Sequence, residues 1–303
     1  MALTMDWTPL LRGELRLTLD ILAGFLIGAL IIRTGLADKA LRRALPRLKR
    51  WGIGATLGAA LTVSLGSSKA GAAVVASALD SGRISPRTAK WGTLLLAFPA
   101  YARRWVATMI LSCSLAGRAG AFFALTLLLR SAAKFALELF ILNRGEHDDR
   151  PQEENAAASR GESARNFGLK LLKTLPLAWF FYALAVLAVP WAEKYLQIWL
   201  RGSAFFPLPA MAVAAASFAH VSAALALAGG SLAAGELSVA QAVFALLFGN
   251  SLSLITRLVR TNAGYYFGFF PRAVAQSMLL WNVAVSAALS LLTLALAALP
   301  LCF

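Results

Sequence analysis

The chain has few of the side chains that carry catalysis or bind metals. Its 303 residues include two cysteines and two histidines, and only 14 acidic residues oppose 29 lysines and arginines. Cys113 and Cys302 lie far apart without a ligand pattern, so we expect both to pack in helices. No nucleophile or carboxylate pair stands at a catalytic spacing from a base, and no phosphate-binding GxxxxGK[ST] loop occurs. The sequence therefore indicates neither an enzyme nor a resident cofactor or metal.

Charge is scarce throughout the chain. Charged residues make up 14% of it and hydrophobic residues 59%, with a mean hydropathy of +0.69, which is too apolar for an ordinary soluble domain. The net charge of +15 lies mostly in loops beside apolar stretches, where basic residues mark the cytoplasmic side of a membrane. We therefore expect an integral membrane protein whose partner is the lipid bilayer and not nucleic acid. The first apolar run is long enough to span, so we expect a span there and not a cleaved signal.

One part of the sequence occurs twice, at an offset of 153 residues. Residues 81–85 (SGRIS) return as residues 234–238 (AGELS). Each copy follows a stretch of small apolar residues, which holds Ser64 in the first half and Ser217 in the second, and each precedes an interrupted apolar helix. Many secondary transporters are built from two such interrupted units.

The first half, residues 1–142, is predicted to contain four membrane elements. A lysine at mid-bilayer in a straight lipid-facing helix would be costly, so the stretch around Lys69 is predicted to be a re-entrant hairpin. Pro99 interrupts the next helix because proline lacks an amide donor. The elements are a span at 15–36, the hairpin at 52–79, a broken span at 91–115 and a span at 119–142.

The second half, residues 167–303, repeats this order after a polar linker at residues 143–166. Its predicted elements are a span at 169–192, a hairpin at 205–233, a broken span at 239–259, interrupted around residues 249–251, and a span at 273–299.

The loop charges favour an inverted repeat. Loop 37–50 carries six basic residues and its counterpart 191–203 carries two, while turn 80–90 carries three and turn 233–243 none. With both termini outside, the predicted inner segments hold 19 of the 29 lysines and arginines. The fold class is therefore expected to be all-α and polytopic, with two inverted repeats, six spans, two re-entrant hairpins and a cytoplasmic linker.

Residues 67–140 and 217–292 resemble the nucleoside-recognition, or Gate, domain of prokaryotic membrane proteins. The likeness rests on residues 79–85, on Phe98-Pro99 with the following arginines, and on residues 265–271 (YYFGFFP). The order of elements also resembles the transport core of concentrative nucleoside transporters. The resemblance implies a bacterial or archaeal cytoplasmic membrane, and a solute held by hairpin tips and unwound helices.

At the matching places this chain offers hydroxyl, amide and basic side chains without carboxylates. Lys69, Arg103 and Arg104 either bind an anion or serve as structural charges. His220 either binds solute, titrates for proton coupling or packs in the core. Asn250 and its neighbouring serines either coordinate sodium or cap a helix break. The candidate substrate-binding residues are Ser67, Ser68, Lys69, Arg103, Arg104, Ser217, His220, Ser222, Asn250, Ser251 and Ser253.

Two other groups of basic residues are assigned structural roles from the sequence. Arg257 and Arg260 either join Lys69 and Arg103 in a cationic pocket or reach the membrane interface at the end of a span, and their place at the end of a span favours the interface. Arg130, Lys134 and Glu138 are expected to form a structural charge cluster, in which Lys134 and Glu138 are four residues apart and can pair.

The function that fits these features is secondary transport of a small anionic solute by alternating access, with Na⁺ or H⁺ as the candidate coupling ion. Two alternatives stay open: a flippase or binding component for a lipid-linked phosphate, and a non-transporting scaffold with a partner subunit. The oligomeric state also stays open, with a homo-oligomer as one candidate.

Overall fold

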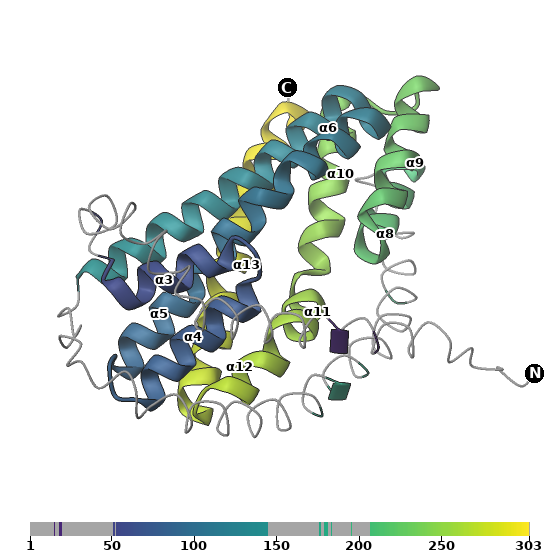
Figure 1. Ribbon diagram of the computed structural model, residues 1–303. Coiled ribbons are helices and arrows are strands. Elements are labelled where there is room, and N and C mark those ends of the chain that lie inside the picture. Colours follow the sequence, from purple (N-terminus) through teal and green to yellow (C-terminus); the bar gives the residue numbers. More distant parts are fainter. Residues whose placement is uncertain are drawn as a thin grey trace, which may run out of the picture. The chain divides into compact units, whose positions relative to one another are not determined.

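The computed structural model describes residues 53–144 and 207–302, together with residue 51 and eight isolated positions before residue 207 (Figure 1). Every regular element in these residues is a helix, which confirms the prediction of an all-α chain. The spans predicted at 15–36 and 169–192 lie outside the described residues apart from those isolated positions, and so does the linker after residue 144.

The first predicted hairpin corresponds to two short helices that pack on each other. Helix α3 covers Ala55–Ser64 and α4 covers Ser68–Asp80. Ser67 caps α4 by accepting a hydrogen bond from the amide of Ala70 at 3.3 Å. The interruption therefore lies at the Gly-Ser-Ser-Lys stretch, where the sequence places it.

Helix α5 (Pro86–Leu95) begins with a proline behind the capping residue Ser85, and ends just before Pro99. Helix α6 (Ala97–Asn143) contains a turn at Ala116–Gly117, where the backbone leaves helical geometry. Its two arms run antiparallel, since the indole of Trp105 donates to the carbonyl of Ala124 at 2.9 Å. The arms correspond to the second part of the predicted broken span and to the span that follows it.

The second half repeats these elements. Helices α8 (Leu208–Ala219) and α9 (Val221–Ala233) pack on each other, and α10 (Val239–Leu252) follows. The chain continues through α11 (Leu254–Leu258), a π-helical turn (Val259–Ala263), α12 (Gly264–Phe269) and the long helix α13 (Arg272–Cys302).

The break in the second half lies later than expected. The sequence places it around residues 249–251, but α10 continues to Leu252 and the chain turns at Ser253. The hydroxyl of Ser253 donates to the carbonyl of Asn250 at 3.0 Å, so a side chain competes for an acceptor that a continuing helix would use.

The repeat is reproduced in the backbone at the same offset of 153 residues. Gly82 and Gly235 both adopt positive φ, at 66° and 72°. The amides of Arg83 and Glu236 donate back to the carbonyls of Ala78 and Ser231, which makes the same Schellman turn twice. Helices α4 and α9 end at equivalent residues, and α5 and α10 begin at equivalent residues with a capping serine.

The chain divides into two compact units, and each combines helices from both halves of the sequence. Unit 1 comprises Met1–Ala100, Phe135–Leu184 and Val259–Leu280, so α3–α5 belong to the same unit as α12. Unit 2 comprises Tyr101–Lys134, Ala185–Leu258 and Trp281–Phe303, so α8–α11 belong with most of α6 and α13.

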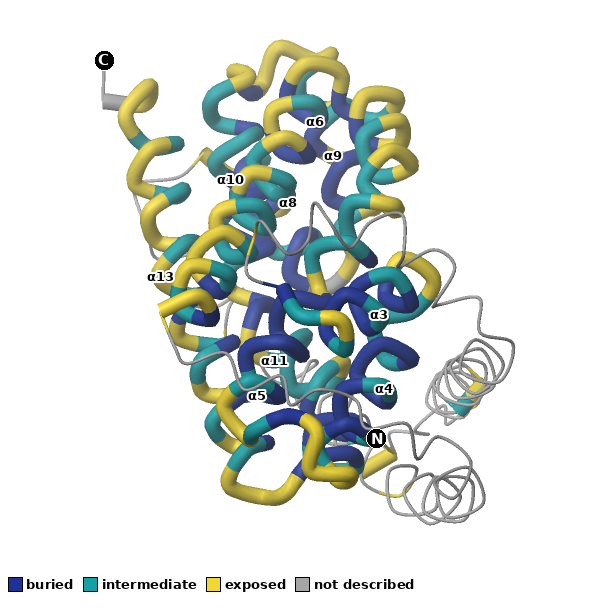
Figure 2. The backbone as a smooth tube through the Cα atoms, turned by 60° about the vertical axis from the view of Figure 1, so that its left-hand side comes forward, coloured by how far each residue is buried: buried dark blue, intermediate teal, exposed yellow. Residues whose placement is uncertain are grey.

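Helix α13 is the strongest candidate for a membrane span. Among the described residues it is the one helix that is long and apolar enough to cross a bilayer, over Arg272–Leu301. The bent pair Val239–Leu252 and Leu254–Phe269 would be a second span if it crosses as one. Only 11% of the apolar window of α13 is buried, and its tube in Figure 2 is mostly exposed or intermediate.

Candidate functional site

Three predicted site residues lie at the α3–α4 tip in unit 1. Ser67, Ser68 and Lys69 are all half-buried. Ser67 caps α4, so its hydroxyl oxygen already accepts a backbone hydrogen bond. Ser68 and Lys69 form the first turn of that helix.

The α8–α9 tip in unit 2 holds three more. Ser217 is buried, and its hydroxyl donates to the carbonyl of Leu246 on α10 at 2.9 Å. This bond ties α8 to α10 and gives the hydroxyl a structural use. His220 joins the two helices in an extended conformation, and both His220 and Ser222 are exposed. The two helices thus present one imidazole and one hydroxyl at this tip.

The α10–α11 break in unit 2 contains Asn250, Ser251 and Ser253. The hydroxyl of Ser251 donates to the carbonyl of Leu247 at 2.7 Å, and that of Ser253 donates to Asn250. Both therefore satisfy backbone acceptors of their own helix. Asn250 is 2% exposed, and its side-chain oxygen accepts a hydrogen bond from Arg257 at 3.3 Å.

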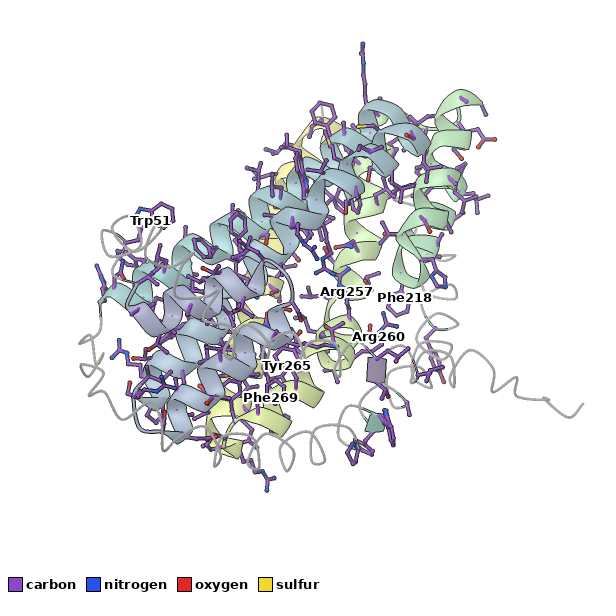
Figure 3. The ribbon with its side chains drawn as sticks, in the orientation of Figure 1. Trp51, Phe218, Arg257, Arg260, Tyr265 and Phe269 are labelled. Carbon is purple, nitrogen blue, oxygen red and sulfur yellow. The ribbon has the colours of Figure 1, made fainter. Side chains whose placement is uncertain are left out.

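Arg257, for which the sequence favours a place at the membrane interface, thus contacts a predicted site residue. It is half-buried on α11 and is labelled in Figure 3. Its hydrogen bond to Asn250 directs the guanidinium back to the helix break. A signal for it exists in the sequence, because Arg257 follows Arg104 by 153 residues, the offset of the repeat.

Three basic side chains lie within electrostatic range of Tyr101 in unit 2. The Tyr101 hydroxyl interacts electrostatically with Arg104, Arg130 and Arg257, and Arg130 also interacts with Arg257. We call Tyr101 and these three arginines the arginine cluster. Arg103 and Arg104 are both exposed on α6.

Arg130 is held in place from α13. Its Nε donates to the hydroxyl of Thr293 at 2.6 Å, and its Nη1 donates to the hydroxyl of Ser290 at 3.2 Å. Its Nη2 is buried without a hydrogen-bond partner, and so is the hydroxyl of Tyr101. The guanidinium is therefore oriented by two contacts and retains an unsatisfied donor.

Lys134 lies one turn further along α6. Its ammonium donates to the side-chain oxygen of Asn282 and, at 3.2 Å, to the hydroxyl of Ser286. The structural role expected for Arg130 and Lys134 thus takes the form of contacts with α13. In the part of the chain that the structure describes, no three His, Cys, Asp or Glu side chains come together as a metal site.

Comparison with known protein families, curated proteins and solved structures found no match to this chain.

Proposed function

We propose that this chain is a polytopic membrane protein that transports a small anionic solute by alternating access between two inverted repeats. The observation that carries the proposal is the 153-residue repeat, which recurs as helix ends, Schellman turns and helix starts at equivalent residues. Repeats with interrupted helices are the architecture of many secondary transporters.

The lengths of the paired helices support re-entrant hairpins. Helices α3, α4, α8 and α9 have 10 to 13 residues, which gives each about 15–20 Å. A bilayer core is about 30 Å thick, so none of them can cross it alone. A pair of apolar helices can instead enter the bilayer and return to the same side. Such a hairpin fits the short helices, provided that protein covers the backbone at its tip.

Exposed apolar side chains support a bilayer around the long helices. On α13, Leu280 is 70% exposed and Leu291 is 67% exposed, and on α6 Ile110 is 63% exposed. Exposed apolar surface on this scale favours association, whereas a bilayer covers it. With α13 and the bent pair as two of them, we propose six spans in all.

In this proposal the helices on either side of the two breaks move during alternating access. Helix breaks at Leu96 and Ser253 free backbone groups in each repeat, and breaks of this kind line solute sites in transporters. Arg104 follows the first break by about two helical turns and Arg257 follows the second by about one, and positive charge near the breaks favours an anion over a neutral solute. The coupling ion in this proposal is Na⁺ or H⁺.

An inverted repeat predicts that equivalent positions of the two halves face opposite sides of the membrane. Ser81 and Ala234 are both exposed helix C-caps, 153 residues apart. In a chain with Cys113→Ser and Cys302→Ser, a membrane-impermeant maleimide should label the Ala234→Cys variant in intact cells. The Ser81→Cys variant should react only after permeabilisation. Labelling of both from the same side would exclude an inverted repeat.

The transport activity is tested by uptake into proteoliposomes under Na⁺ and H⁺ gradients. The panel contains inorganic phosphate, a nucleotide, a dicarboxylate and a neutral nucleoside, with protein-free vesicles as the control. We expect saturable uptake of at least one anion and none of the nucleoside. Movement of an isoprenoid phosphate between leaflets, without uptake of any soluble anion, would favour a flippase. If nothing moves, the chain is not a transporter.

A further inference from the structure

Two basic segments of the chain meet at one end of unit 1. The ammonium of Lys90 on α5 donates to the hydroxyl of Ser277 on α13 at 2.7 Å, although 187 residues separate them. Lys90 lies four residues after the start of α5, and Ser277 lies five residues after the start of α13. Each contact residue is therefore within about 8 Å, along its helix, of the start of that helix. The loop charges predict that both helix starts lie on the inner side of the membrane.

This end of unit 1 has an excess of positive charge. The turn before α5 and the starts of α5 and α13 carry four basic side chains, which we call the basic end of unit 1: Arg83, Arg87, Lys90 and Arg272. Lys90 is half-buried and the three arginines are exposed. Among the described residues of unit 1, the acidic side chains are Asp80, which is exposed at the end of α4, and Glu138, which is buried. Four positive charges against one exposed negative charge leave an excess of three.

The second repeat shows that the fold of this turn does not require basic residues. Its α9–α10 turn has the same Schellman geometry and the same capping serine as the α4–α5 turn. The residues equivalent to Arg83, Arg87 and Lys90 are Glu236, Ala240 and Val243. Acidic and neutral residues thus permit the same backbone, so the turn itself does not explain the positive charge of the first repeat.

Lys90 is the member of this group that is held in place. In addition to its bond to Ser277, its ammonium lies 4.6 Å from the centre of the Trp91 ring, which is 7% exposed. At a membrane–water interface a tryptophan ring packs against apolar groups while a lysine ammonium reaches the headgroups. Arg87 lies three residues before Lys90 on α5, so the two residues share a helix face. One fixed charge and one exposed charge therefore lie next to each other at this end of unit 1.

We propose that the basic end of unit 1 binds the phosphate headgroup of an anionic phospholipid in the inner leaflet. Anionic lipids give the cytoplasmic leaflet a negative surface potential, and basic pockets between membrane helices on that side bind their headgroups. Arginine binds phosphate oxygens through paired N–H bonds, and lysine adds a compact charge. This inference goes beyond the proposed function, because the headgroup binds whether or not the chain transports a solute.

The test is native mass spectrometry of the full chain in a neutral detergent, titrated with phosphatidylglycerol or with phosphatidylcholine as the neutral probe. The first bound phosphatidylglycerol should have a lower dissociation constant than the first bound phosphatidylcholine. Loss of one basic residue near the headgroup should raise the dissociation constant for phosphatidylglycerol about fivefold in Arg87→Gln and in Lys90→Gln. Arg118→Gln is the matched control, because it removes an exposed arginine at the α6 turn, which is predicted to lie outside. Its dissociation constant should match that of the unmodified chain.

Two further comparisons separate headgroup binding from an effect on the fold. Arg87 is exposed, so Arg87→Gln should melt at the temperature of the unmodified chain. Lys90 also contacts Ser277, so Lys90→Arg, which keeps the charge, should retain the binding that Lys90→Gln loses.

Equal affinities of the unmodified chain for the two lipids would overturn the inference. A loss in Arg118→Gln as large as that in Arg87→Gln would overturn it as well, since any interfacial arginine would then suffice. Selective loss in Arg87→Gln supports the headgroup site even if proteoliposomes transport no anion, which would overturn the transport function alone. Transport of an anion together with unchanged lipid binding in Arg87→Gln and Lys90→Gln would retain the transport function and overturn the headgroup site.

Discussion

Replacing Gly229 by alanine is expected to destabilise the folded chain by about 3 kcal/mol. Gly229 lies on α9, and a Cβ placed there would be 1.9 Å from the carbonyl oxygen of Leu115 and 3.0 Å from its carbon. Both atoms belong to the backbone of α6, so no side chain can rotate to make room. Packed interiors do not absorb such an overlap, and one of the helices must shift. Close approach through small residues is also how membrane helices associate.

The adjacent glycine is the matched control for this prediction. A Cβ at Gly230 meets no atom within 4 Å, so Gly230→Ala should be neutral or slightly stabilising. The apparent melting temperature in detergent is the measurement. For a chain of this size, about 3 kcal/mol corresponds to a decrease of roughly 6–12 °C in Gly229→Ala. Equal melting temperatures for the two variants would mean that α9 does not approach α6 as the structure has it.

The helical class and the positions of the interruptions could be predicted because local sequence determines them. Gly66 and the serines after it end one helix and cap the next, and Pro99 admits only a new helix start. The repeat was visible for the same reason, since Gly82 and Gly235 provide the positive φ that each Schellman turn requires. The break at Ser253 was misplaced because it depends on a side-chain hydrogen bond and not on a helix-breaking residue type.

The candidate site was predicted by residue type but not by partner. Ser217 is a polar residue in an apolar stretch, and nothing local to it shows that α10 supplies its acceptor. Arg257 looks like an interfacial arginine until its contact with Asn250 is known. Tyr101 carries no sequence signal, because it lies in an apolar helix start and its environment comes from α6 and α11. Contacts between segments far apart in sequence decide each of these cases.

The polar contacts between α6 and α13 in unit 2 also depend on partners that lie far away in the sequence. Spacing predicts that Lys134 can pair with Glu138 on its own helix, but it does not predict contacts with another helix. The structure gives Lys134 two partners on α13, Asn282 and Ser286, while Arg130 contacts Ser290 and Thr293. Two basic residues one turn apart on α6 thus align with a row of polar side chains on α13. These contacts set the register between the two helices.

We expect Lys134→Met to destabilise the chain by about 2 kcal/mol, because Asn282, which is 3% exposed, loses a charged hydrogen-bond donor. Asn282→Leu should cost a similar amount, since the half-buried ammonium of Lys134 then loses an acceptor. The double variant removes both ends of the contact, so its loss should be smaller than the sum by about 1.5 kcal/mol, near the upper limit for membrane helices. Denaturation in detergent measures the stability of the two single variants and the double variant, which together form a double-mutant cycle.

The control cycle combines Lys134→Met with Thr126→Val. The hydroxyl of Thr126 donates to the carbonyl of Phe122 on its own helix, so the two losses of stability should add within about 0.5 kcal/mol. Additivity in the Lys134–Asn282 cycle as well would exclude this contact as what holds α6 in register with α13.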